Sequence, residues 1–550
     1  MFMRTARGVI ASGLWLLMAA PGWAAGPTTF DQVVSRISQR ETQFAQNMHN
    51  YSPMVETYIQ DMKPDAELGE VPSGDTYFLG RLEQNRATVS ASFVSAHNGI
   101  LHRLFGPLTA MKYNPAGFAV VSPDETELDS AHYEFTFVRR EFLGDVRCLV
   151  FDLVPKKNSG QGRFLGRLWV EDQDYNIVRF NGTYVPRPRF GYYFHFDSWR
   201  LNIGPNLWLP AYTYSEEMDM KYSLPHKHLS FKAQTRYWAY NVHSHGRQDE
   251  LTQVLVDPAP TVKDQSDSAQ DMSPVQATRM WARQSEENVL DKLERAGLLA
   301  REGEVDKVLE TVVNNIAITN KIDLQPELHC RVLLTAPMES FSVGHTIVVS
   351  RGLLDVLPDE ATLAAVLAHE MSHILLAHGQ NPMYGFNDRM LFPERQTFTQ
   401  LTLSHAPAQE QEADAKALEL LRHSPYKDQL AGAGLFLRAL EQRAPVLPNL
   451  IRAHLGNGLT LGSSPRMSEL IASAPALEMN KLDQIAALPM GARIKVDPWS
   501  DRAQMSKAKP VALLSAREKM FFEVTPVFPY LSRVNEKQAT EKVAATSPSQ

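Results

Sequence analysis

The stretch LPDEATLAAVLAHEMSHILLAHG, residues 357–379, predicts a buried helix that carries two histidines on one face. Pro358 suits the first helical turn, and Gly379 suits the C-terminal cap. Because alanine, valine and leucine flank the histidines, we expect this helix to lie inside a core. Histidines in such surroundings are costly unless a buried partner compensates for the loss of water.

The histidines belong to the pentapeptide HEMSH, residues 369–373. Residues four apart on a helix lie about 5–6 Å apart, so His369 and His373 can bind one tetrahedral metal ion. Glu370 projects about 100° away from His369, beside the metal, where it can take a proton from a water molecule. The pentapeptide alone is only suggestive, but its apolar flanks favour a metal over a chance pair of histidines.

A second helix is predicted over residues 407–422, PAQEQEADAKALELLR, and it supplies carboxylates. Glu410 and Asp414 share one face, whereas Glu412 points about 200° away from Glu410. We therefore predict Glu410 as the third metal ligand, with Asp414 hydrogen-bonded to a ligating histidine. Two histidines and one carboxylate favour a single Zn²⁺ per chain. The alternative is an acidic helix face that is simply solvated.

The HExxH pattern at 369–373, followed by Glu-x-Glu-Ala-Asp at 410–414, resembles the HtpX/BepA-like zinc metallopeptidases, which are relatives of the CaaX prenyl proteases. The segment TIVVSRGLL at 346–354 is similar to the strand and GLL turn of that family. The resemblance covers roughly residues 305–474. It implies a zinc metalloendopeptidase with zinc at His369, His373 and Glu410, and hydrolysis assisted by Glu370.

Two positions depart from the family pattern. The family's Asn-Ala-Phe is replaced by MESF at 338–341, and its late His-Pro with a following arginine is replaced by SPR at 464–466. A histidine that could assist catalysis is therefore missing, and the group that stabilises the oxyanion stays unassigned. His378 matches a histidine common in the family, and we expect it to be a buried structural residue.

The N-terminus has the pattern of a signal peptide over residues 1–24. Arg4 and Arg7 precede an apolar run at 9–20, and the small residues Gly22 and Ala24 suit a cleavage site. An N-terminal anchor helix is the alternative, but the run is short for a membrane span. We expect a periplasmic protein of a Gram-negative type of envelope, with no transmembrane segment after signal removal.

The sequence between the signal peptide and residue 257 predicts one helix and a sheet. Apolar spacing indicates a helix over about 28–59, and alternating or aromatic-rich runs with short turns indicate a meander of antiparallel strands. The expected strands are 132–138, 147–154, 164–170, 177–185, 192–196, 207–214 and 229–240. The aromatic texture resembles the half-open sheet of LolA-like carriers. These aromatics could line a groove, although packing against a helix is the more common reason for them.

The expected fold class is α+β and multidomain. An N-terminal antiparallel β-rich domain is followed by a mainly helical zinc metallopeptidase domain with a small sheet, for which 330–335 and 340–350 are the strand-like pieces. The linker DPAPTVKDQSDSAQDMSP has little to bury. The predicted divisions are 1–24 signal peptide, 25–256 β-rich domain, 257–274 linker, 275–488 metallopeptidase domain, 489–535 C-terminal extension and 536–550 disordered tail.

Composition limits the possible partners. A formal net charge of −7 without basic runs argues against nucleic acid. We expect polypeptide substrates, such as misassembled envelope proteins, with peripheral membrane association as a possibility. The alternative is a periplasmic chaperone, or a lipoprotein- or lipid-binding module, whose protease site is regulated or vestigial. Cys148 and Cys330 are expected to be buried free thiols, and residues 380–400 to form a lid.

Overall fold

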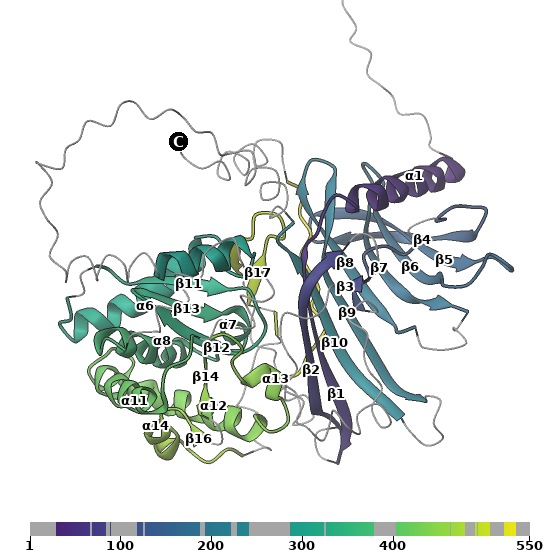
Figure 1. Ribbon diagram of the computed structural model, residues 1–550. Coiled ribbons are helices and arrows are strands. Elements are labelled where there is room, and N and C mark those ends of the chain that lie inside the picture. The colour runs from purple at the N-terminus through teal and green to yellow at the C-terminus, as the bar shows by residue number, and fades with distance from the viewer. Residues whose placement is uncertain are drawn as a thin grey trace, which may run out of the picture.

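The computed structural model describes a wide sheet beside a mainly helical region (Figure 1). The described residues are 29–66, 69–83, 88–89, 118–124, 127–186, 193–221, 228–240, 286–323, 326–378, 403–461, 464–478, 490–491, 493–506 and 522–534. The predicted signal peptide, linker, lid and tail lie outside them.

The first helix is shorter than the apolar spacing predicted. Helix α1 (Phe30–Met48) begins with a capping box, in which the Thr29 side chain accepts a hydrogen bond from the backbone of Gln32. The expectation of a helix to residue 59 is wrong, because strand β1 (Met54–Asp65) begins five residues after His49. The sequence MVETYI at its start is rich in β-branched and aromatic residues, which pack well in a sheet.

Within the described residues, ten strands form one antiparallel sheet in the order β3-β2-β1-β10-β9-β8-β7-β6-β5-β4. The meander from β4 to β10 confirms the predicted antiparallel sheet, but the strand expected at 192–196 begins only at Phe196, as β8. Strands β1, β2 and β3 extend the sheet beyond β10 and were not predicted. The remaining strands are β2 (Gly69–Glu83), β3 (Thr88–Val89), β4 (Tyr133–Leu143), β5 (Val146–Pro155), β6 (Arg163–Glu171), β7 (Ile177–Val185), β8 (Phe196–Gly204), β9 (Leu207–Lys221) and β10 (His228–Trp238).

The two faces of the sheet have different neighbours. Val34 and Ile37 of α1 join a cluster with Phe164 and Phe180 on one face. Trp199 of β8, on the other face, belongs to a larger cluster that continues into the helical region. The described aromatic side chains of the sheet therefore mostly lie in hydrophobic cores. Core packing was the more common of the two roles that the sequence suggested for them, the other being the lining of a groove.

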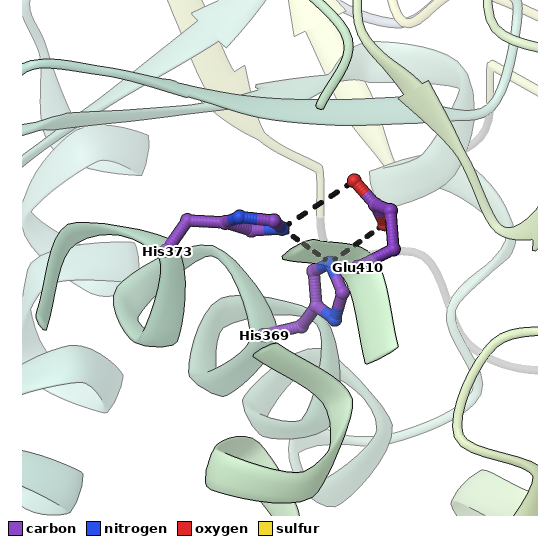
Figure 2. Close-up of side chains that lie close together, drawn as sticks. All are labelled: His369, His373 and Glu410. Carbon is purple, nitrogen blue, oxygen red and sulfur yellow. Dashed lines mark hydrogen bonds and ion pairs between the residues drawn. The ribbon is translucent and has the colours of Figure 1, made fainter. Parts of the chain in front are cut away.

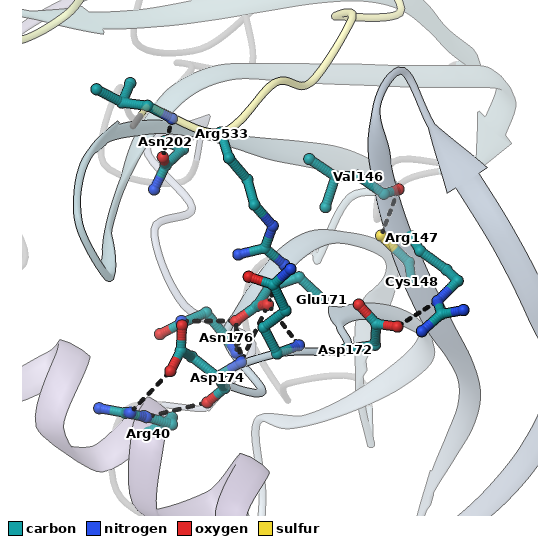
Figure 3. A network of polar contacts seen from close by, with 12 residues as sticks. Arg40, Val146, Arg147, Cys148, Glu171, Asp172, Asp174, Asn176, Asn202 and Arg533 are labelled. Carbon is teal, nitrogen blue, oxygen red and sulfur yellow. Dashed lines mark hydrogen bonds and ion pairs between the residues drawn. The ribbon is translucent and has the colours of Figure 1, made fainter. Parts of the chain in front are cut away.

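The C-terminal residues 522–534 cross this second face. Gln60 of β1 binds the segment near its start, where its side-chain amide donates to the Phe522 carbonyl and accepts from the Val524 amide. Near its end, Arg533 donates to the buried carboxylate of Glu171 (Figure 3). Burial opposes the charge on Glu171, but Arg533 and backbone N–H groups outweigh it and lower the pKa of this carboxyl. The segment is thus held to the sheet by buried polar contacts at both ends.

The helical region surrounds a small sheet of order β11-β13-β12-β14. The expected strand at 340–350 is in fact a hairpin, because Gly344 adopts φ +59 and turns the chain between β12 and β13. The elements are α6 (Glu304–Thr319), β11 (His329–Leu333), β12 (Glu339–Val343), β13 (Thr346–Ser350), α7 (Arg351–Val356), α8 (Glu360–Leu375), α11 (Pro407–Arg422), α12 (Leu430–Arg443), α13 (Pro448–Ile451), β14 (Asn457–Gly458), β15 (Thr460–Leu461), β16 (Ser464–Pro465), α14 (Ser468–Ser473), β17 (Ile494–Val496) and β18 (Ala503–Met505).

The two regions are joined by buried hydrogen bonds. The Glu56 carboxylate of β1 accepts from the backbone N–H of Ala336 at 2.6 Å. Asp75 of β2 accepts from the backbone N–H of Leu450, at the end of α13, at 2.9 Å. Because both acceptors are carboxylates and both donors lie beside the small sheet, the wide sheet helps to fix the backbone that leads into β12.

Two further expectations concern thiols and membranes. Cys148 and Cys330 are buried and free, as predicted. In the part of the chain that the structure describes, no helix combines the length and the apolar character that crossing a membrane requires.

Candidate metal centre

Three side chains converge on one point between helices α8 and α11 (Figure 2). The Nε2 atoms of His369 and His373 lie 3.0 Å apart. The Glu410 carboxylate places Oε2 3.3 Å from Nε2 of His369 and Oε1 3.5 Å from Nε2 of His373. One ligand atom from each residue lies within 4.8 Å of the others, and all three side chains are buried. The structure thus brings together the three residues chosen as metal ligands from the sequence.

The local sequence explains this convergence. Helix α8 begins at Glu360 rather than at residue 357, because the Asp359 side chain caps it by accepting from the backbone N–H of Thr362 at 2.8 Å. Helix α11 spans the predicted residues 407–422, with Pro407 in its first turn. Alanines line much of the described interior of both helices, so the two backbones can approach closely enough for one ion to be shared.

Asp414 lies behind His369. Its Oδ1 atom is 2.7 Å from Nδ1 of His369, and its Oδ2 atom accepts from the backbone N–H of Met467 at 2.8 Å. A carboxylate can only accept here, so it places the imidazole proton on Nδ1 and leaves the Nε2 lone pair for a metal.

His373 has a different support. Its Nδ1 atom lies 3.0 Å from Nδ1 of His378, and Nε2 of His378 lies 3.2 Å from Oε2 of Glu412. A proton on Nδ1 of His373 and another on Nε2 of His378 satisfy both contacts, and this leaves Nε2 of His373 free for a metal. Glu412 does point away from the metal ligands, as the helical geometry predicted, but its carboxylate contacts His378. His378 therefore orients His373. The sequence predicted only a buried structural role for His378, without this contact.

A fourth histidine, His405, lies beside the site, and the sequence analysis did not predict it. The ring of His405 stacks on that of His373, with centroids 3.9 Å apart and planes 11° apart. Burial lowers the pKa of His405 to about 4, so the ring is neutral at neutral pH. His405 lies in the short segment before α11, where no periodicity relates it to the HExxH helix.

Glu370 is fully buried, and two neighbouring side chains lie close to one of its oxygens. The Ser340 hydroxyl donates to Oε1 at 2.6 Å, and Nη1 of Arg466 lies 3.5 Å from the same oxygen. The Oε2 atom is buried and has no hydrogen-bond partner among the described residues. The site therefore holds a carboxylate that is anchored on one side only.

Arg466 also contacts the third ligand, since its Nε atom lies 3.1 Å from Oε2 of Glu410. In the sequence, Arg466 stood out only as the last residue of SPR, the segment found in place of the family's His-Pro. The guanidinium is 2% exposed, so it is a buried positive charge that contacts two carboxylates.

The donor set fits a divalent metal. Burial opposes the charge on Glu410, but His369 and Arg466 outweigh it and lower the pKa of this carboxyl. Burial, aided by the nearby His369 and His405, lowers the pKa of His373 and keeps its ring neutral. An ionised carboxylate beside imidazole nitrogens with converging lone pairs is the chemistry that divalent zinc sites use.

A small apolar cavity of about 10 Å³ lies beside His369. Its lining includes Val366 of α8, Phe436 and Leu437 of α12, and Arg466. A cavity of this volume is about the size of one water molecule, so the side chains beside the metal ligands are closely packed there.

Two histidines four apart on a helix, a glutamate between them and a glutamate from a second helix are the arrangement that the HExxH pattern predicts. Residues 300–478, less than half of the chain, match the family model described as Peptidase family M48. This match supports a metallopeptidase and the resemblance to the HtpX/BepA-like family. A comparison with curated proteins gives no match.

The N-terminal region is similar to several solved structures. A LolA superfamily protein from Nitrosomonas europaea matches with 13% identity and a TM-score of 0.17, covering 36% of this chain and 91% of that one. A DUF1329 family protein from Desulfovibrio piger matches with 9% identity and a TM-score of 0.17, covering 38% and 93%. The MucA/MucB complex of Pseudomonas aeruginosa matches with 7% identity and a TM-score of 0.12, covering 38% and 93%.

Proposed function

We propose that this protein is a zinc-dependent endopeptidase in which His369, His373 and Glu410 hold the metal and Glu370 is the general base. The observation that carries the proposal is the convergence of two Nε2 atoms and one ionised carboxylate, all buried, with Glu370 next to His369 in α8. Asp414 and His378 support it, because their contacts leave both Nε2 lone pairs available.

The zinc, when bound, supplies a Lewis acid that polarises the scissile carbonyl and lowers the pKa of a water molecule towards about 7. Glu370 would take a proton from the attacking water as the water oxygen bonds to the carbonyl carbon, and it would deliver that proton to the amine nitrogen as the C–N bond breaks. Arg466 holds a buried positive charge beside both glutamates, so it balances the charge of a site that is rich in carboxylates.

The proposed setting is the periplasm, and the proposed substrates are misfolded or misassembled cell-envelope proteins. The basic residues, apolar run and small residues of the first 24 positions support export. The N-terminal sheet, joined to the peptidase domain by buried contacts, is part of the framework of that site.

The test is metal content and cleavage on the same preparations. Wild type should contain one zinc per chain and cleave an unfolded polypeptide such as denatured casein. His369→Ala and Glu410→Ala should lose most of the zinc, whereas Glu370→Gln should keep it and lose cleavage. Glu419→Ala, an exposed carboxylate on α11, is the control for Glu410→Ala. Wild type without zinc after reconstitution, or full cleavage by Glu370→Gln, would contradict the proposal.

A further inference from the structure

Ser340 presents a hydroxyl to the metal centre from a strand, not from either helix of the HExxH site. It lies in β12, where its backbone pairs with Val349 of β13 on one side and with Asn457 of β14 on the other. Both Ser340 and Glu370 have 0% of their surface exposed. The hydrogen bond of 2.6 Å between them is therefore a buried contact to a charged acceptor, the strong kind of hydrogen bond in proteins.

The contact distinguishes the two oxygens of Glu370. Oε1 accepts from Ser340 and also faces Nη1 of Arg466. Oε2 is equally buried but has no hydrogen-bond partner among the residues that the structure describes. Rotation of the carboxylate about its bond to the chain would exchange the two oxygens, and it would break the bond to Ser340.

We infer that Ser340 is a positioning residue for the general base: it holds Oε1 so that Oε2 is the oxygen that receives the proton from water. This inference rests on the proposed function. Ser340 keeps its own proton throughout, and the transferred proton passes from water to Oε2 and then to the leaving amine nitrogen. A base that is fixed in this way needs no reorganisation at the moment of transfer.

Further hydrogen bonds hold the backbone of the strand that carries Ser340. The neighbouring Glu339 carboxylate accepts from the backbone N–H groups of His454, Leu455 and Gly456 at 2.8–3.0 Å. At its start, the chain is fixed by the bond from Ala336 to Glu56 of the wide sheet. Because the backbone of β12 cannot shift easily, the hydroxyl of Ser340 defines a fixed position for Oε1.

The decisive variant is Ser340→Ala in the full-length protein, loaded with zinc and assayed with a fluorogenic peptide. We expect kcat to fall on the order of 10-fold to 100-fold, as for a misplaced catalytic group, with KM changed less than about 2-fold. Zinc content should match wild type, and the melting temperature of the metal-free protein should fall no further than that of the Ser424→Ala control, which also loses a buried hydroxyl. Ser340→Thr, which keeps the hydroxyl, should recover most of the lost kcat. Ser424→Ala removes another buried hydroxyl far from the site and is the matched control.

The outcomes separate this inference from the proposed function. If zinc-loaded wild type cleaves nothing, the proposed function fails. If wild type cleaves and Ser340→Ala retains its kcat, the positioning role is overturned while the protease remains. A Ser340→Ala protein that loses zinc or melts well below Ser424→Ala would also overturn it, since the hydroxyl would then be structural. A crystal structure of Ser340→Ala should show the Glu370 carboxylate in more than one orientation, and an unchanged single orientation would count against positioning.

Discussion

Asp414 joins the metal centre to a backbone that is distant in sequence, because one of its oxygens lies 2.7 Å from Nδ1 of His369 and the other accepts from the Met467 amide at 2.8 Å. Met467 adopts the left-handed conformation, with φ +51, directly after Arg466. The carboxylate thus fixes both the ring of a ligand and the turn that presents the buried guanidinium.

Asp414→Ala should weaken zinc binding without abolishing it. Partners of this kind typically contribute 10-fold to 100-fold to metal affinity, because they fix the tautomer and orientation of the ligand. We expect the zinc dissociation constant, measured by competition with a chelator, to rise by about that factor. Glu419→Ala on the same helix should leave it unchanged. An unaltered constant for Asp414→Ala would show that His369 is oriented without this carboxylate.

A buried ion pair holds α1 on the wide sheet. The Arg200 guanidinium of β8 donates to both oxygens of Glu41, at 2.6 and 2.8 Å, and it also lies 3.6 Å from the centre of the Phe44 ring. Glu41→Ala leaves the arginine buried and unpaired, so it should lower the free energy of unfolding by about 3–5 kcal/mol. Urea unfolding followed by fluorescence measures this loss.

The matched control for that variant is Asp291→Ala, which breaks an exposed pair with Arg295. Exposed pairs contribute about 0–1 kcal/mol, so this change should be close to neutral. Equal effects of the two substitutions would mean that the bond between Glu41 and Arg200 does not stabilise the packing of α1.

Asp501 should make stability depend on pH. Burial raises the pKa of this carboxyl to about 7, although the Ala239 amide donates to it at 2.8 Å. A pKa raised above its ordinary value favours the folded state below about pH 4, and this contribution is lost as the pH rises to about 7. The slope between these values should approach about 1.4 kcal/mol per pH unit. Asp501→Asn should flatten it, whereas Asp428→Asn, an exposed change, should not. Parallel curves for wild type and Asp501→Asn between pH 4 and 8 would contradict the assignment.

The parts of the site that follow from helical periodicity could be predicted from the sequence. His369 and His373 are four apart on one helix, and Glu410 and Asp414 are four apart on the next, so spacing alone places each pair on one face. The antiparallel meander from β4 to β10 was predictable for a similar reason, because its strands alternate and its turns are short.

The remaining contacts depend on tertiary packing. Ser340 comes from a strand, Arg466 from a turn and His405 from the segment before α11, and no period relates them to the HExxH helix. Strand β2 pairs with the neighbouring strand β1, so it was missed together with β1. One of the two partners of β1 is β10, more than 150 residues away, as when Met54 pairs with Trp238. Long-range pairing of this kind leaves little trace in local sequence.

Gly352 connects the small sheet to the metal centre through close packing. It lies in α7, where its backbone N–H donates to the Thr335 carbonyl at 3.0 Å. A Cβ atom at this position would lie only 1.7 Å from the carbonyl oxygen of Ala336, which is backbone and cannot rotate away. Ala336 leads into β12, so any shift that relieves this clash moves the strand that carries Ser340.

Gly352→Ala should therefore destabilise the protein by about 3 kcal/mol, the upper end for overpacking, and lower kcat in the protein that still folds. Gly432→Ala in α12 is the control, because its added Cβ would meet only a flexible side-chain oxygen of Asp359 at 3.2 Å. Alanine is favoured over glycine in a helix by about 0.5–1 kcal/mol, so this control should be neutral or slightly stabilising. Urea midpoints and cleavage rates of the two variants give the comparison. A Gly352→Ala protein with the midpoint and kcat of wild type would show that Ala336 can move without disturbing β12.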